Sequence, residues 1–293
     1  MSMARRLAKP YRIDHGKRFR LKHVDPTDTG GIDSPDDARA WLQAGIELLS
    51  KMQEKLYAQD RWALLLIFQA MDAAGKDGTI RHVMSGVNPQ GCEVFSFKAP
   101  SAEELDHDYM WRTTCRLPER GRIGIFNRSY YEETLVVRVH RQILEGQRLP
   151  PELVTKHIWT ERFEDIRAFE RYATRNGIVI RKFFLHVSRE EQRRRFLKRL
   201  EQPSKNWKFS VGDTKERDFW KDYMHAYEDM IQHTATPDAP WYVVPADHKW
   251  FTRLIVSAAI VDALDEMDLE FPKVDKAKRK ELRAARTMLE HEK

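Results

Sequence analysis

The sequence predicts an α/β fold built on a mostly parallel sheet. Its 293 residues are 41% hydrophobic, which is enough for a sizeable core. Short apolar runs alternate with helical patterns, and the connections between them are short. The run 63–68 is wholly apolar, as is typical of a strand buried on both faces of a parallel sheet. Ligands of such sheets bind at the carboxyl ends of strands, so the loops after residues 69, 127 and 187 are the first candidates for a site.

The order of the elements follows from hydrophobic periodicity and from signals at helix ends. The expected strands are 61–69, 92–97, 122–127, 178–187 and 241–245. The expected helices are 36–57, 79–85, 101–114, 131–145, 151–175, 188–200, 213–233, 250–267 and 276–292. Ser34, Ser101 and Ser188 each precede acidic residues and are typical helix N-caps. Three regions result: an N-terminal arm over 1–35, a core over 36–272 and a charged helical tail over 273–293.

Composition excludes several classes of protein. Cys92 and Cys115 are too few for a disulfide scaffold or a cysteine-based zinc finger. No apolar run is long enough to span a membrane, and the basic N-terminus lacks the apolar stretch of a secretory signal. We therefore expect a cytoplasmic protein with free thiols and no membrane partner.

Positive charge is concentrated in two segments. Residues 1–22 hold eight basic residues and one acid, and residues 189–208 hold eight basic residues and three acids. The chain as a whole carries only +6, so the remainder is net negative. Each segment is either a solvated basic face or part of a polyanion site, and the second alternative needs an independent phosphate motif.

The loop after the first expected strand supplies such a motif, although in a variant form. Residues 70–79 read AMDAAGKDGT, whereas the P-loop pattern is G-x-x-x-x-G-K-[ST]. Gly75 and Lys76 match, but Ala70 replaces the first glycine and Asp77 replaces the hydroxyl residue. The strand–loop–helix context favours a phosphate site formed by backbone N–H groups, with Lys76 as a point charge. The alternative is an ordinary βα turn. The candidate phosphate-binding residues here are Ala73, Ala74, Gly75, Lys76, Asp77, Gly78 and Thr79.

Asp72 and Asp77 are unexpected in a pure anion site because their carboxylates repel phosphate. A divalent cation between carboxylate and phosphate removes the conflict, and Mg²⁺ commonly uses one or two carboxylates in this way. We therefore expect Mg²⁺, with Mn²⁺ as the alternative ion, near Asp72. Asp72 could also orient or deprotonate an attacking oxygen, or serve only as a turn residue.

A second polar loop follows the strand 122–127. Asn127 stands where P-loop enzymes carry a metal-holding aspartate, so it could serve only as a neutral ligand or through water. Arg128 at the strand tip is suited to a transferring phosphoryl group, with a surface ion pair as the alternative. Glu132 is either part of the site or a solvated helix starter.

Together these segments resemble the polyphosphate kinase 2 family. The matching segments occur in the family's order over roughly residues 40–265: 68–80, 125–132, 191–196, 206–209 and 239–245. The loop variants at Ala70, Asp77 and Asn127, together with residues 86–89 and 21–26, look like class III members. The C-terminal tail is not covered by the resemblance.

The resemblance implies a thymidylate-kinase-like P-loop core with a mobile helical lid over about 188–235. It implies direct phosphoryl transfer between inorganic polyphosphate and nucleoside mono- or diphosphates, AMP to ADP and ADP to ATP, with Mg²⁺. Asp72, Lys76 and Arg128 would be the catalytic residues, and Arg193 and Arg195 of the lid would face phosphates. Arg199 and Lys208 belong to the same basic run. Adenine nucleotides, guanine nucleotides as an extension, and a homo-oligomeric assembly are expected on the same ground.

Two other functions compete with this interpretation. An ATP-dependent nucleotide kinase would need fewer cations than the run 193–208 supplies, which suits a longer polyanion. A non-catalytic nucleic-acid-binding protein would fit the basic segments but not the paired acids of the loop, so we expect no nucleic-acid partner. Turnover of nucleotides with polyphosphate as the sole donor separates all three.

Overall fold

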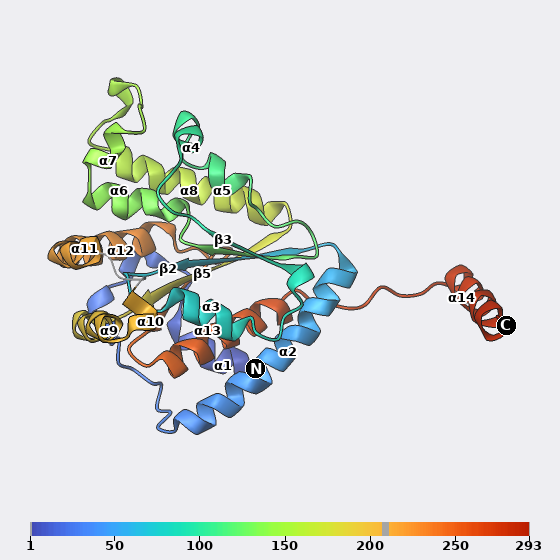
Figure 1. Cartoon of the computed structure of the whole chain (residues 1–293). Helices are drawn as coiled ribbons and strands as arrows, with labels where there is room; N and C mark the ends of the chain where they lie inside the picture. The colour runs from blue at the N-terminus through green and yellow to red at the C-terminus, as the bar shows by residue number, and fades with distance from the viewer. Residues whose placement is uncertain (1, 207–210, 293) are drawn as a thin grey trace.

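The computed structural model describes residues 2–206 and 211–292 and has a mixed sheet between two layers of helices (Figure 1). The six strands lie in the order β1-β6-β5-β2-β4-β3. All neighbours are parallel except β1, which pairs antiparallel with β6 at one edge. The predicted α/β fold is confirmed. The strands are β1 Arg12–Ile13, β2 Ala63–Gln69, β3 Cys92–Ser96, β4 Ile123–Asn127, β5 Ile178–His186 and β6 Trp241–Pro245.

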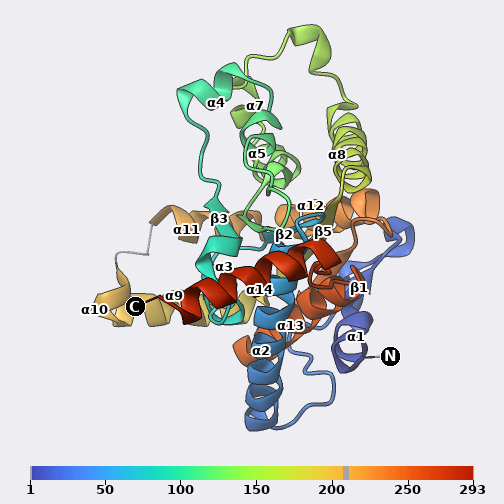
Figure 2. The ribbon, with the colours of Figure 1, turned by 90° about the vertical axis from the view of Figure 1, so that its right-hand side faces the viewer.

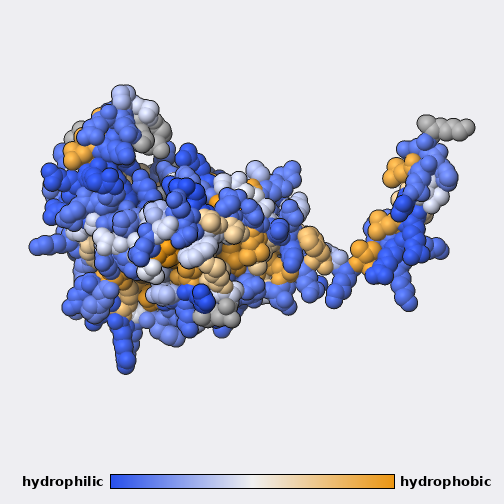
Figure 3. Space-filling model, turned by 90° about the horizontal axis from the view of Figure 1, so that it is seen from below, coloured by the Kyte–Doolittle hydropathy of each residue, from blue (hydrophilic) through white to orange (hydrophobic). Residues whose placement is uncertain are grey.

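One face of the sheet is covered by α1 (Met3–Ala8), α2 (Pro35–Gln59), α3 (Lys76–Val83) and α13 (Lys249–Asp265), which pack on one another. Thirteen residues of α13 are buried, because this helix is apolar on nearly every side. Seen from below, the molecule is mostly hydrophilic, with hydrophobic residues gathered in the middle of the body and along the C-terminal tail (Figure 3).

The opposite face carries α8 (Ile158–Arg175) and α12 (Trp220–Thr234). The remaining α-helices are α4 Ala102–Asp106, α5 Trp111–Thr114, α6 Val136–Val139, α7 Gln142–Glu145, α9 Arg189–Glu201, α10 Pro203–Asn206, α11 Val211–Lys215 and α14 Lys276–Glu290. The short helices α4, α5 and α7 lie in the upper part of the view in Figure 2. The 3-10 turns are η1 Lys9–Tyr11, η2 Gly16–Arg18, η3 Leu21–His23, η4 Pro89–Gly91, η5 Tyr130–Thr134, η6 Pro151–Leu153 and η7 Glu216–Phe219.

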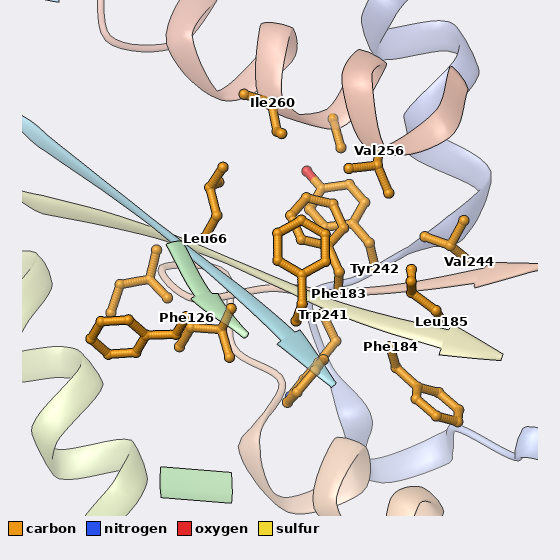
Figure 4. Packing of buried hydrophobic residues seen from close by; sticks show 14 of the residues in the cluster. Leu66, Phe126, Phe183, Phe184, Leu185, Trp241, Tyr242, Val244, Val256 and Ile260 are labelled. Atoms are coloured by element: carbon orange, nitrogen blue, oxygen red, sulfur yellow. The ribbon is translucent and has the colours of Figure 1, made fainter. Parts of the chain in front are cut away.

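The core is centred on the sheet. Phe183 and Tyr242 stack with ring centroids 5.3 Å apart, beneath Val256 and Ile260 of α13 (Figure 4). Every residue of β2 is buried, as its apolar sequence predicts for a central parallel strand.

A buried ion pair lies on the other side of the sheet. Lys182 of β5 donates to Glu170 of α8 at 2.6 Å, and the two side chains are 0% and 2% exposed. The hydroxyls of Tyr130 and Tyr131 also donate to this carboxylate. The pair therefore fixes the turn that follows Arg128.

The N-terminal segment packs against the core, whereas the C-terminal helix does not. The segment 2–35, predicted as an arm, packs closely: Tyr11, Phe19 and Leu21 are buried, and β1 extends the sheet. The predicted helical tail is α14, all of whose residues are exposed, and Figure 1 shows it lying well away from the body.

Several helices are shorter than expected. The segment 101–114 forms α4 and α5 rather than one helix, although the capping box of Ser101 and Glu104 is present. The segment 131–145 is broken into η5, α6 and α7. The helix expected from residue 151 begins at Ile158, because Pro150 and Pro151 start a separate 3-10 turn. In the described chain, no helix is long and apolar enough to cross a bilayer. Both cysteines are free thiols, as expected.

Stability should depend on pH through His186, at the end of β5. Burial lowers the pKa of His186 from 6.5 to about 4, although Asp25 opposes the change. The folded state therefore disfavours protonation, so this group's contribution is present above pH 6.5 and is lost as the pH falls toward 4. We expect the free energy of unfolding to lose about 2 kcal/mol between pH 7.5 and 5.0 from this residue. Urea unfolding at both pH values checks this, and His186→Phe should show a correspondingly smaller change. Equal pH dependence in both proteins would contradict it.

Candidate functional site

The loop between β2 and α3 has a backbone suited to anion binding. Ala73 has φ 62° and Gly75 has φ 108°, so both adopt left-handed conformations. Glycine accepts this conformation at no steric cost, whereas Ala73 stores strain there, as residues at functional sites often do. Gly75 is the N-cap of α3 and offers no side-chain cap, so the first N–H groups of that helix remain for a ligand.

Lys76 begins α3 and is held inside the loop. Its side chain is 9% exposed, and Nζ donates to the backbone oxygen of Ala70 at 2.7 Å. Burial lowers the pKa of Lys76 and Arg128 adds to the effect, while Asp72 and Glu132 oppose it. An arriving phosphate would relieve this desolvated cation, because opposite charge favours the ammonium form.

Arg128 follows β4 and contacts the phosphate loop. Its Nη2 donates to Oδ1 of Asp72 at 3.1 Å, and the two side chains are 39% and 34% exposed. Glu132 raises the pKa of Arg128 and Asp72 adds to the effect, against the cost of burial. The backbone at Arg128 has φ 66°, a second non-glycine residue of the site in the left-handed region. The three residues proposed as catalytic therefore lie in one cluster.

Two further predicted residues extend this cluster. Asn127 Nδ2 donates to Oδ1 of Asp77 at 2.8 Å, which links β4 to the first turn of α3. Glu132 is half-buried, and burial raises its pKa although Arg128 and Lys76 oppose the change. Glu132 therefore interacts electrostatically with both of these cations.

A cavity of about 800 Å³ opens beside these loops. Nine lysines and arginines line it against three aspartates, so the cavity is strongly electropositive. The predicted residues that line it are Asp72, Ala73, Ala74, Gly75, Lys76, Asp77, Gly78, Thr79, Asn127, Arg128, Arg195 and Arg199.

The basic helix α9 contributes to this cavity unevenly. Lys198 and Arg199 line it, and Arg199 Nη1 lies 3.9 Å from Oδ2 of Asp213. Arg193 is exposed and is not among the lining residues. Lys208, the last predicted member of the basic run, lies outside the described residues.

Arg195 is placed differently from the sequence expectation. It is 5% exposed, and its three nitrogens donate to five protein oxygens. The acceptors are Glu191 Oε1 and the backbone oxygens of Ala73, Ala74, Ala246 and Asp247, at 2.5–3.0 Å. An arginine has five N–H donors, so none is left for a phosphate in this arrangement. Arg195 lines the cavity, but in this arrangement its donors are paired within the protein, and its predicted phosphate contact stays a prediction.

Four basic residues of the cavity were not singled out from the sequence. Lys98 follows β3, and Lys249 and Arg253 follow β6, while Arg81 lies on α3. The signal for the first three was available, because parallel strands end at the same edge of the sheet. The loops predicted to carry the site follow residues 69, 127 and 187, and they leave out the ends of β3 and β6.

The described residues contain no group of three or more histidine, cysteine, aspartate or glutamate side chains arranged to hold a metal ion. Mg²⁺ takes one or two carboxylates and completes its shell with substrate phosphates and water. Asp72 and Asp77 both line the cavity, with Asn127 beside them. The donor set thus fits a magnesium ion shared with a phosphate rather than a metal site made by protein alone.

Comparison with known proteins gives a consistent result. The model of the family polyphosphate kinase 2 (PPK2) matches residues 32–272. An ADP-polyphosphate phosphotransferase of Rhodopseudomonas palustris is 51% identical, over 96% of this chain and 98% of that protein. An AMP/ADP-polyphosphate phosphotransferase of Meiothermus ruber is 44% identical, over 93% and 98%. The crystal structure of polyphosphate kinase 2 from Arthrobacter aurescens superposes with a TM-score of 0.87 at 39% identity, covering 97% of this chain and 99% of that one.

The contact between Asn127 and Asp77 provides a test for a cation at this site. Asn127→Asp replaces an N–H donor with a carboxylate facing Asp77, so we expect stability in EDTA to fall by about 1 kcal/mol. A cation between the two carboxylates would reverse the loss. Thermal unfolding with and without Mg²⁺ measures this, and Asn127→Ala is the control that loses the donor without adding charge. A Mg²⁺-induced rise in Tm no larger in Asn127→Asp than in wild type would count against a cation here.

Proposed function

This chain belongs to the polyphosphate kinase 2 family, and we propose that it uses the cavity beside the phosphate loop to move phosphoryl groups between inorganic polyphosphate and nucleoside mono- or diphosphates. The single observation that carries the proposal is the gathering of nine cationic side chains around Asp72 and the loop 70–79. A phosphate-rich substrate is the ligand that such a cavity can neutralise.

The residues support a direct transfer. An oxygen of the acceptor nucleotide's terminal phosphate attacks the end phosphorus of polyphosphate, and the P–O–P bond breaks to release a chain one unit shorter. The protein has to hold the two reactants in line and stabilise the charge on the transferred group. Arg128 is hydrogen-bonded to Asp72, and Asp72 acts electrostatically on the buried Lys76, so we assign these two cations that task.

The role assigned to Asp72 is to bind the magnesium ion that accompanies the substrate phosphates. A magnesium ion near Asp72 would neutralise charge on the reacting phosphates and fix their orientation. Arg128 already orients the Asp72 carboxylate through a charge-assisted hydrogen bond. The orientation of the carboxylate is therefore fixed before a cation binds, and Asn127 and Asp77 line the same cavity.

Polyphosphate is favoured over ATP as the phosphoryl donor by the distribution of charge. Lys198 and Arg199 lie on α9, away from the loop cluster, yet they line the same cavity. A triphosphate would be satisfied near the loop, whereas a longer chain could continue along α9. If ATP phosphorylated AMP faster than polyphosphate did, an ordinary nucleotide kinase would be the better description.

Both AMP and ADP are proposed as acceptors. The Meiothermus ruber relative is named for AMP and ADP, and the Rhodopseudomonas palustris relative for ADP. Adenine nucleotides are therefore the first substrates to assay, and a Pseudomonas aeruginosa relative named a GDP-polyphosphate phosphotransferase makes guanine nucleotides the next. The homo-oligomer and the cytoplasmic location expected from the sequence remain predictions, the first checked by sedimentation velocity.

The loop charges should be needed for transfer. We expect Lys76→Met and Asp72→Asn each to lower kcat by about 10²–10³, since each removes a charge at the reacting phosphates with little change of shape. Initial rates of ADP and ATP formation from polyphosphate measure the effect, with Mg²⁺ varied for Asp72→Asn. A variant that retains its thermal stability and works within a few-fold of wild type would refute the role of that residue.

Lys198 and Arg199 of α9 should affect the KM only for long polyphosphate donors. We expect Lys198→Ala and Arg199→Ala to raise KM for long polyphosphate several-fold, because they remove contacts beyond the loop, and to leave KM for short chains nearly unchanged. Salt should produce the same difference, since partly exposed contacts are screened. The control is Lys221→Ala, an exposed lysine of α12 that does not line the cavity. Equal effects on long and short donors would show that the chain does not extend along α9.

A further inference from the structure

The first half of α9 is attached to the phosphate loop by hydrogen bonds that no substrate contact explains. Gln192 Nε2 donates to the backbone oxygen of Asp72 at 3.0 Å. Arg195 Nη1 donates to the next two oxygens, those of Ala73 and Ala74, at 3.0 and 2.6 Å. Three consecutive carbonyl groups of the loop are therefore held by two side chains one helical turn apart.

The two side chains that make these contacts are buried. Gln192 is 1% exposed and Arg195 is 5% exposed. The second Arg195 terminal nitrogen holds the oxygens of Ala246 and Asp247, so the same guanidinium joins the loop to the turn after β6. The Asp247 carboxylate in turn accepts from the backbone N–H of Ser188, the N-cap of α9.

The Gln192 amide also contacts the second part of the predicted lid. Arg217 of η7 donates to Gln192 Oε1 at 2.6 Å and to the backbone oxygen of Arg189 at 3.0 Å. Arginine can only donate, so its partner on Gln192 must be the amide oxygen. The amide nitrogen is then left to face Asp72, which makes the contact to the loop depend on the contact to Arg217.

We propose that Gln192 and Arg195 are positioning residues that hold the phosphate loop in its anion-binding conformation, and that Gln192 couples this conformation to the position of Arg217. A loop carbonyl held by α9 cannot turn toward the phosphate, where its dipole would oppose binding. Misplacing the reacting groups by about 1 Å can cost a hundredfold in rate. The inference rests on the proposed phosphate site at residues 72–79.

The variants Gln192→Ala and Gln192→Glu test the contact to the loop. Glutamate keeps an acceptor for Arg217 but, when ionised, has no donor for the Asp72 oxygen. We expect both variants to lower kcat ten- to a hundredfold and to leave KM for polyphosphate within about twofold, because the cations that attract the donor remain. Amide hydrogen exchange of residues 73–78 should accelerate about tenfold in a protein that still unfolds in one cooperative thermal transition. Gln202→Ala, at the other end of the same helix, is the control.

The coupling is tested by Arg217→Ala and by the double variant with Gln192→Ala. We expect Arg217→Ala alone to lower kcat three- to tenfold and to accelerate exchange in the loop. The double variant should be no worse than Gln192→Ala, because both act through one hydrogen-bonded chain. Additive effects, or wild-type loop exchange in Arg217→Ala, would overturn the coupling.

The same experiments separate this inference from the proposed function. If Lys76→Met loses transfer while both Gln192 variants keep wild-type kcat and loop exchange, the site stands and the positioning role is wrong. If Lys76→Met and Asp72→Asn remain active, the proposed site itself is wrong. Arg195→Lys keeps the charge but loses most of the carbonyl contacts, so loop exchange should accelerate in this variant as well. Wild-type exchange of residues 73–78 in a folded Arg195→Lys protein would overturn the role of Arg195.

Discussion

Mutual repulsion among cations is the constraint on which this site depends. Nine lysines and arginines line one cavity of about 800 Å³, and the protein has to keep them there before any anion arrives. At a separation of 4 Å, two like charges repel by about 4 kcal/mol even at a surface-like effective dielectric of 20. The fold offsets this cost by giving the key cations local partners: Asp72 for Arg128, the Ala70 oxygen for Lys76, and Asp213 near Arg199.

These partners differ in how easily they can be exchanged for a phosphate. The ion pair of Arg128 and Asp72 is more than one-third exposed on both sides, so solvent screens it and it contributes little to stability. Lys76 is held by a single neutral carbonyl, and burial already disfavours its charged form. Both cations therefore gain by turning to a phosphate. Arg195 is the opposite case, because its side chain is buried and all five of its N–H donors have protein acceptors, so any phosphate contact would have to displace one of them.

The sequence predicted the sheet well because its signals were local. The apolar runs gave β2 to β6 within one or two residues, and Ser34 and Ser188 gave the starts of α2 and α9. It failed where the outcome depends on tertiary contacts: β1 is only two residues long and exists through its pairing with β6. The segment 131–145 has a helical pattern, but the hydroxyls of Tyr130 and Tyr131 are fixed by the buried Glu170, and the chain forms η5, α6 and α7 in place of one helix.

In the candidate site, too, local sequence motifs were predictable and features that depend on tertiary contacts were not. The residues of the loop 72–79 were identifiable because a phosphate loop is a contiguous motif, and Arg128 because it ends a strand. Arg195 and its neighbours on α9 form one run of like charge, and composition cannot tell which member is exposed. Helical geometry decides it: Gln192, Arg195 and Phe196 are buried on one side, whereas Arg193 and Arg194 are exposed. Gln192 and Arg195 are hydrogen-bonded to the phosphate loop, so the first half of α9 is attached to the core. A lid movement that keeps these contacts would begin beyond Arg195, at the end of the helix that carries Lys198 and Arg199.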